Sequence, residues 1–316
     1  GAVMGMAFPI GLLVLGTARR QRYRYCDEVA AGLLGRVPCI AVLPDADEGA
    51  ALSQAAAHGV HELRVRLQPK NPADRRAYVI TSVDASEGKT SLAAALGLSF
   101  AAAGFRTVVI DADLASRQLT LNFDAEESPG LVEAAANTEP AIRRVRGGLS
   151  VLTAGSCRPQ DAFRLAPAAV GRLLTSLRER FDVVLIDSDP ILTGLAASVI
   201  APHADGVVLA LARGQQQARV QSAVRHLQIL GAVPAAAVFN RADAGDFHAV
   251  LSAQTPGPNR VLPERLNRFG SLVGATLASL SLTREDDMDL MPVGFALAKS
   301  DQSGRAEAQN ESRRVA

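Results

Sequence analysis

Apolar runs of strand length alternate with longer helical stretches between Ala77 and Asn240. This alternation is typical of a parallel sheet with helices on both faces. The predicted strands are apolar runs rich in β-branched residues, at 78–82, 107–110, 150–152, 183–186, 207–211 and 235–239. We therefore predict an α/β fold built on a doubly wound, mostly parallel sheet.

Two stretches have the apolar spacing of helices that pack on such a sheet, residues 167–180 and 215–230. The first begins with Pro167, whose fixed φ suits a first turn, and the second is followed by Gly231, a common helix stop. Ligands of open parallel sheets bind beyond the carboxyl ends of the strands. The residues that follow each predicted strand are therefore the candidates for chemistry.

The N-terminal residues predict a membrane segment. Residues 2–16 carry no charge, and Arg19, Arg20, Arg22 and Arg24 follow them. A basic cluster after an apolar run places the later residues in the cytoplasm. Because the run is shorter than the roughly 20 residues that span a bilayer and the chain begins with Gly1, we interpret residues 1–18 as a transmembrane helix remnant, truncated upstream. The alternative is a buried core helix, but such a helix needs no cluster of arginines at its end.

The rest of the chain divides at changes of composition. We assign residues 19–70 to a juxtamembrane linker and helix, and residues 71–250 to a P-loop domain. Residues 255–259 are rich in proline and glycine, and from Ser300 onward almost every residue is small, polar or charged. Such a composition cannot bury enough apolar surface to fold, so we predict that the extension 251–316 is largely disordered.

The net charge and the spacing of cysteines and histidines argue against several classes of function. The 316 residues carry a net charge of +1, with a pI near 8.0, and show no broad basic stripe, so no nucleic-acid partner is expected. The three cysteines are widely spaced, and the five histidines follow no metal-binding spacing. Neither residue type points to a metal centre or a redox pair.

A phosphate-binding loop is predicted where the first strand meets a helix. Its residues are Ser86, Glu87, Gly88, Lys89, Thr90 and Ser91. Backbone amides at a helix start bind phosphate oxygens, Lys89 would lie between the β- and γ-phosphates, and the Thr90 hydroxyl would reach Mg²⁺. The full P-loop pattern has glycine five positions before Gly88, where this chain has Val83. The flanking strand and helix supply the context that the pattern alone lacks.

Three carboxylates follow two of the predicted strands. Asp111 and Asp113 follow the second strand, and Asp187 ends the apolar run 183–186. A carboxylate at this place reaches Mg²⁺ directly or through water, whereas its structural alternative is a helix or turn cap. With the phosphate loop upstream, we take Lys89, Asp111, Asp113 and Asp187 as the catalytic candidates. Thr90, Asp113 and Asp187 are the metal candidates.

These motifs resemble those of the bacterial tyrosine kinases of capsule and exopolysaccharide synthesis. That family belongs to the deviant-P-loop ATPases, which include partition and division-site proteins. The resemblance covers residues 25–245 and is carried by Val79-Ile80-Thr81-Ser82, Glu87-Gly88-Lys89-Thr90, Val109-Ile110-Asp111-Ala112-Asp113-Leu114, the run 181–190 and Val238-Phe239-Asn240-Arg241-Ala242-Asp243. It implies ATP and Mg²⁺ as cofactors, Asp111 as the activating carboxylate and Asn240 facing the adenine.

The resemblance also implies a place in the cell. It suggests a Mg-ATP domain anchored in the inner membrane and facing the cytoplasm, acting as an ATPase or protein-tyrosine kinase. Such a domain would regulate polymerisation or export of exopolysaccharide, capsule or lipopolysaccharide. Its implied partners are the polysaccharide machinery in the membrane, other copies of the chain in a homo-oligomer, and a protein-tyrosine substrate or phosphatase.

Several positions depart from the family pattern. Ala85 and Ser86 replace its proline and glycine, and Asp189 replaces a proline, which adds negative charge near phosphate. The tail lacks the family's tyrosine cluster, since the three tyrosines are Tyr23, Tyr25 and Tyr78. Two other functions therefore stay open: a degenerate, non-enzymatic adaptor, and a soluble partition-type ATPase.

Overall fold

The computed structural model describes residues 21–33, 37, 39–44, 50–71, 73–123, 129–156 and 158–242. The predicted membrane segment 1–18 and the extension 251–316 lie outside these residues. Within the described part of the chain, none of the helices combines the length and apolar character needed to cross a membrane.

The described strands form one sheet of eight, in the order β1-β8-β7-β2-β6-β3-β5-β4. Neighbouring strands are parallel except β4 and β5. All six predicted strands are confirmed, and β1 and β4 were not predicted. The bounds are β1 Cys39–Pro44, β2 Arg76–Ser82, β3 Thr107–Ala112, β4 Arg143–Arg144, β5 Ser150–Leu152, β6 Val183–Ser188, β7 Gly206–Ala212 and β8 Pro234–Ala242.

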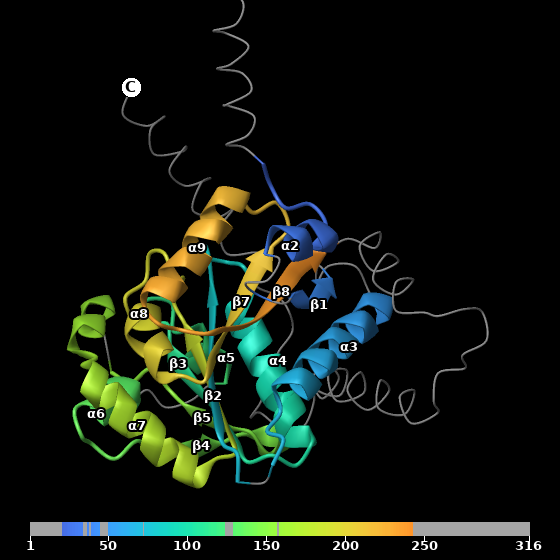
Figure 1. Cartoon of the computed structure of the whole chain (residues 1–316). Helices are drawn as coiled ribbons and strands as arrows, with labels where there is room; N and C mark the ends of the chain where they lie inside the picture. Colours follow the sequence, from blue (N-terminus) through green and yellow to red (C-terminus); the bar gives the residue numbers. More distant parts are fainter. Residues whose placement is uncertain are drawn as a thin grey trace, which may run out of the picture.

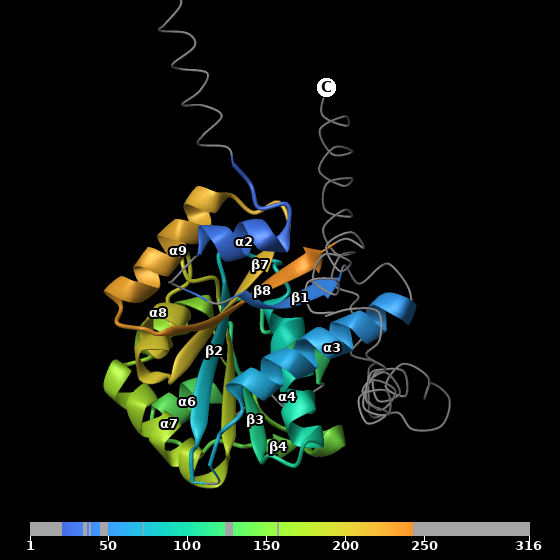
Figure 2. The same ribbon diagram turned by 45° about the vertical axis from the view of Figure 1, so that its right-hand side comes forward.

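Helices cover both faces of the sheet, as Figures 1 and 2 show from two directions. On one face lie α3 and α4, and on the other lie α2, α6, α7, α8 and α9. Both predicted helices are confirmed, as α7 and α9. The bounds are α2 Cys26–Gly32, α3 Ala50–Leu67, α4 Lys89–Ala102, α5 Gln118–Asn122, α6 Leu131–Ala135, α7 Pro167–Arg180, α8 Ala196–Ile200 and α9 Gln217–Ile229, with 3₁₀ turns at Arg146–Gly148, Pro159–Arg164 and Ala201–His203.

The central strands are buried on both faces because each side chain meets a helix layer. On β2, Tyr78 and Ile80 pack with α3 and α4, whereas Ala77 and Val79 pack in the opposite core. This explains why the strands contain continuous apolar runs rather than an alternation of apolar and polar residues. The resulting rigid sheet presents the carboxyl ends of β2, β3 and β6 side by side.

The segment before α2 is attached to the turn that precedes α9. Arg22 forms an antiparallel bridge with Gln216, the Tyr23 amide donates to the Gln215 carbonyl at 2.9 Å, and the Tyr23 carbonyl accepts from the Gly214 amide at 2.7 Å. The Tyr23 side chain is fully buried. Together with β1, which pairs with β8, this segment joins residues of the predicted 19–70 linker to the sheet domain. The boundary at residue 71 stays a prediction.

Candidate functional site

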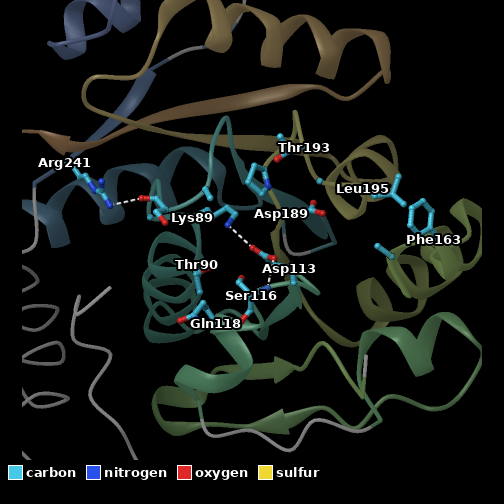
Figure 3. Close-up of a pocket in the computed structure, with 17 residues that line it drawn as sticks. Lys89, Thr90, Asp113, Ser116, Gln118, Phe163, Asp189, Thr193, Leu195 and Arg241 are labelled. Atoms are coloured by element: carbon cyan, nitrogen blue, oxygen red, sulfur yellow. Dashed lines mark hydrogen bonds and ion pairs between the residues drawn. The ribbon is translucent and has the colours of Figure 1, made fainter. Parts of the chain in front are cut away.

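A cavity of 610 Å³ opens at the carboxyl ends of the central strands, between the β2–α4 loop and the residues after β3 and β6. Figure 3 shows Arg241 and Phe163 at opposite ends of it, with Lys89 and Asp113 between them. The polar lining comes from the predicted loop and from later segments: Ser86, Lys89, Thr90, Asp113, Ser116, Gln118, Asp189, Thr193 and Arg241. This is the position where ligands of parallel α/β sheets bind.

The β2–α4 loop ends in a helix start that suits an anion. Gly88 precedes α4 with a φ of 84°, and a Cβ placed there would lie 2.1 Å from Asn240 Nδ2. Glycine is therefore required for both the backbone conformation and the space. The next residue, Lys89, opens α4, whose first amides have no partner within the helix. Such amides and the helix dipole together favour phosphate.

Lys89 and Asp113 form a buried ion pair at the centre of the cavity. Lys89 Nζ lies 2.9 Å from Asp113 Oδ2, and both side chains are more than nine-tenths buried. Burial alone would raise the pKa of Asp113, but the Lys89 ammonium and hydrogen bonds from Ser116 outweigh it and lower that pKa. The ammonium of Lys89 thus faces the cavity beside a charged carboxylate.

Asp111 lies behind this pair and does not line the cavity. Its Oδ2 accepts hydrogen bonds from the Thr120 amide at 2.8 Å and from the Thr120 hydroxyl at 2.7 Å. Its Oδ1 accepts a hydrogen bond from the Asp113 amide at 3.3 Å. Complete burial raises the pKa of Asp111 to about 6, although the Thr120 bonds oppose the shift. This carboxylate holds α5 and the backbone of Asp113 in place.

Asp187 is a fully buried carboxylate whose two oxygens have no hydrogen-bond partner among the described residues. It lies directly opposite Asp111 in the β3–β6 register. Burial, and then the negative charge of Asp111, raise the pKa of Asp187 well above its ordinary value, although the charge of Lys89 and the Thr90 side chain oppose the shift. Because a buried carboxylate without partners is costly, this position calls for a bound cation or a proton.

Three side chains hold the phosphate loop by its backbone, Glu87 and Asn240 from outside the cavity and Arg241 from its wall. Glu87 is buried, and its Oε2 accepts from the amides of Val83 at 2.8 Å and Asp84 at 3.0 Å. Asn240 Nδ2 donates to the Glu87 carbonyl at 2.9 Å, and Arg241 Nη2 donates to the Ser86 carbonyl at 2.7 Å. The structure therefore places Glu87 and Asn240 against the loop itself.

The predicted site residues thus fall into two groups. Ser86, Gly88, Lys89, Thr90 and Asp113 line the cavity, whereas the others do not, namely Glu87, Ser91, Asp111, Asp187 and Asn240. The roles assigned to all of them from sequence stay predictions.

Asp189 also lines the cavity, but its charge already has partners. Its oxygens accept from the amides of Ala196 at 3.2 Å and Ala197 at 2.7 Å, so it binds the first turn of α8. Arg241 and Phe163 are cavity residues that the sequence did not single out for a role. Arg241 follows the last predicted strand, 235–239, and so lay among the positions to inspect, whereas Phe163, which is 81% exposed, shows no periodic signal.

The fold and the loop define this protein as a P-loop nucleotide-binding domain. The CobQ/CobB/MinD/ParA nucleotide binding domain family matches residues 78–313. The tyrosine-protein kinase YwqD of Bacillus subtilis is 30% identical over 168 residues, which cover 50% of this chain and 71% of YwqD. The succinoglycan biosynthesis transport protein ExoP of Rhizobium meliloti is 29% identical over 182 residues, 55% of this chain but 23% of ExoP.

A solved structure agrees with these relatives. The BceF tyrosine kinase domain superposes with a TM-score of 0.60 at 25% identity, covering 70% of this chain and 99% of that domain. The chain belongs to the CobQ/CobB/MinD/ParA nucleotide-binding family and, within it, to the bacterial tyrosine kinases, enzymes of ATP-dependent phosphoryl transfer. The resemblance stated from its motifs is confirmed.

Proposed function

We propose that this chain binds Mg-ATP in the cavity and transfers the γ-phosphoryl group to a tyrosine hydroxyl of a protein. The observation that carries the proposal is the Lys89 ammonium, held 2.9 Å from Asp113 at the start of α4 and facing the cavity. A lysine in this place stabilises the charge of a transferring phosphoryl group, while the helix-start amides hold the other phosphate oxygens.

The residues present fit a magnesium ion. Burial leaves the charge of Asp187 only partly compensated by Lys89 and the Thr90 side chain, and Thr90 and Asp113 line the adjacent cavity. Within the described ranges, no cluster of three or more His, Cys, Asp or Glu side chains could hold a metal ion. Protein carboxylates alone would thus not complete the coordination, and Thr90, Asp113 and Asp187 would hold Mg²⁺ together with phosphate oxygens and water. When bound, the ion would neutralise negative charge on the phosphates.

We assign the proton of the acceptor hydroxyl to the Asp111–Asp113 pair. Asp113 lines the cavity, and its amide is hydrogen-bonded to Asp111. A base must lie within hydrogen-bond reach of the proton that it takes, either directly or through one water. Asp113 lines the cavity wall but is paired with Lys89, so Asp111, with its pKa of about 6, would take the proton through one water.

The tyrosines of the chain limit the choice of acceptor. Tyr23 and Tyr78 are buried, and the Tyr78 hydroxyl donates to the Leu67 carbonyl at 2.8 Å. Burial raises the pKa of Tyr78 to about 12, which also disfavours it as a nucleophile. Tyr25 is 49% exposed. The acceptor is therefore either Tyr25 or a tyrosine of another protein.

We further propose that this activity regulates polymerisation or export of an extracellular polysaccharide at the inner membrane. The domain would face the cytoplasm, anchored through residues 1–18, and would act on the membrane-bound polysaccharide machinery. Support comes from the similarity to ExoP, a succinoglycan biosynthesis transport protein, and from the uncharged N-terminal run followed by four arginines. A homo-oligomer and a cognate phosphatase are the further partners expected.

Incubation of the full chain with γ-labelled Mg-ATP tests the chemistry, with free phosphate and protein phosphotyrosine both followed. Lys89→Ala is the inactive variant, and Lys70→Ala, which removes an exposed lysine, is the matched control. We expect phosphotyrosine that is lost in Lys89→Ala and retained in Lys70→Ala. Free phosphate alone would show an ATPase without kinase activity. If neither product forms and no nucleotide binds, the chain is an adaptor of the same fold.

A further inference from the structure

The phosphate loop adopts its shape with little help from glycine. Between β2 and Gly88 the residues are Val83, Asp84, Ala85, Ser86 and Glu87. Ser86 has a φ of 61°, in the left-handed region that side chains other than those of glycine and asparagine rarely adopt. A backbone conformation of this kind persists only where surrounding contacts hold it. The loop therefore depends on side chains that bind it from outside.

Asp84 joins this loop to helix α9 and to the turn that precedes the helix. Gln215 Nε2 donates to Asp84 Oδ2 at 2.7 Å, and Arg219 Nε donates to the same oxygen at 3.1 Å. Arg219 Nη2 also forms an ion pair with Asp84 Oδ1, so the guanidinium engages both carboxylate oxygens. Bidentate pairs of this kind fix orientation as well as charge. We name Asp84, Gln215 and Arg219 the loop brace.

The brace is itself anchored at its far end. The Gln215 carbonyl accepts the hydrogen bond from the Tyr23 amide, so Gln215 is held between the N-terminal segment and Asp84. Arg219 lies in the first turn of α9, a helix that buries Val220, Val224 and Leu227 against the sheet. The backbone of both donors is therefore fixed by packed structure.

We propose that Arg219 and Gln215 are positioning residues for nucleotide binding, which hold Asp84 outward and so keep the loop amides in their phosphate-binding arrangement. This rests on the proposed function, since it takes the cavity to be a nucleotide site. The brace also neutralises Asp84, whose carboxylate would otherwise add negative charge beside a polyphosphate.

Loss of Arg219 is expected to weaken Mg-ADP binding about three- to tenfold. The size is limited because the Arg219 and Asp84 side chains are 41% and 39% exposed, and solvent screens such pairs. The loss should appear in affinity while the fold stays intact, because α9 keeps its buried apolar face. A role confined to stability would instead lower the melting temperature and leave the Kd unchanged.

Titration calorimetry of the full chain with Mg-ADP tests the proposal in four proteins: wild type, Arg219→Ala, Arg219→Lys and Arg225→Ala. Arg225 is an exposed arginine on the same helix and serves as the matched control. We expect wild-type affinity in Arg225→Ala and the largest loss in Arg219→Ala. The loss should be smaller in Arg219→Lys, because lysine keeps the charge but cannot bind both Asp84 oxygens as the guanidinium does. The melting temperatures without nucleotide should agree among all four proteins.

A double-mutant cycle with Asp84→Asn identifies the route of the effect. If Arg219 acts through Asp84, adding Arg219→Ala to Asp84→Asn should cost less affinity than Arg219→Ala costs alone. Equal Kd values for wild type and Arg219→Ala would overturn the inference while leaving the proposed function standing. A wild-type chain that binds no Mg-ADP would overturn both. Should Arg219→Ala fold poorly, Gln215→Ala provides the same comparison.

Discussion

The Glu87 carboxylate makes the phosphate loop sensitive to pH. Burial raises the pKa of Glu87 from 4.5 to about 7, although its bonds to the Asp84 and Val83 amides oppose the shift. Between these values the folded protein holds a proton that the unfolded chain has released. The free energy of unfolding therefore falls as the pH rises from 4.5 to 7, by an amount on the order of 3 kcal/mol for this group.

Glu87→Gln should remove this part of the pH dependence, because glutamine keeps one acceptor oxygen for the two amides and carries no charge. Urea unfolding of wild type and variant at pH 4.5 and pH 7.5 measures the difference. Other buried carboxylates titrate in both proteins, so the comparison isolates Glu87. Equal pH slopes in the two proteins would contradict the prediction.

Asp187 is expected to lower the stability of the nucleotide-free protein. Its buried oxygens have no hydrogen-bond partner among the described residues, so either its charge or its protonation costs free energy. Asp187→Asn should raise the free energy of unfolding in metal-free buffer at pH 8 by roughly 1–3 kcal/mol. The same variant should lose much of the stabilisation that Mg-ADP gives. An asparagine variant that is less stable than wild type in metal-free buffer would refute this.

At the residue scale, the sequence predicted which residues lie at the site better than it predicted where their side chains point. Lys89 and Thr90 were located because a strand, a short loop and a helix start leave little freedom for the residues between. The directions of Glu87 and Asn240 depend on loop backbone atoms that become available only after the chain has folded. Asp189 looked like an unpaired charge, since the α8 amides that it binds are seven and eight positions later.

Among the elements, helix α4 packs closely on β3 through Gly97. A Cβ at this position would lie 2.5 Å from Val109 Cγ2 and 3.2 Å from Leu149 Cδ1. Gly97→Ala should destabilise the fold by about 1–2 kcal/mol, because overpacking exceeds the gain in helix propensity. Gly171→Ala in α7 is the matched control, since its Cβ would meet His203 at an ordinary 3.4 Å. Thermal unfolding should show a lower Tm for the first variant and an equal or higher Tm for the second.

The elements that were predicted share one property. The six confirmed strands and helices α7 and α9 bury regular apolar patterns against neighbours, and such patterns are visible in sequence. Strand β1 was missed because it lies before the alternating pattern of residues 77–240 from which the strands were predicted. It is a strand because β8, almost 200 residues later, supplies its hydrogen bonds. Two-residue β4 is likewise defined only by β5.

For the whole molecule, ligand binding and stability should be linked. A ligand that binds only the folded state adds about 4 kcal/mol at 1,000 times its Kd. We predict that Mg-ADP raises the Tm of the full chain, that EDTA reverses most of the increase, and that Lys89→Ala abolishes it. Scanning calorimetry with and without each component measures these effects. An increase in Tm that survives in Lys89→Ala would place the nucleotide somewhere other than this cavity.

The contacts that hold the phosphate loop join parts of the chain that are synthesised far apart. The bonds from Arg219, Asn240 and Arg241 to the loop span 135, 153 and 155 positions. During translation the loop and α4 leave the ribosome well before α9 and β8 do, and contacts of such long range form late in folding. A nascent chain that has not yet added these last elements has the phosphate motif but lacks the contacts that shape it. The ability to bind nucleotide therefore arises late in folding, when α9 and β8 pack onto the sheet.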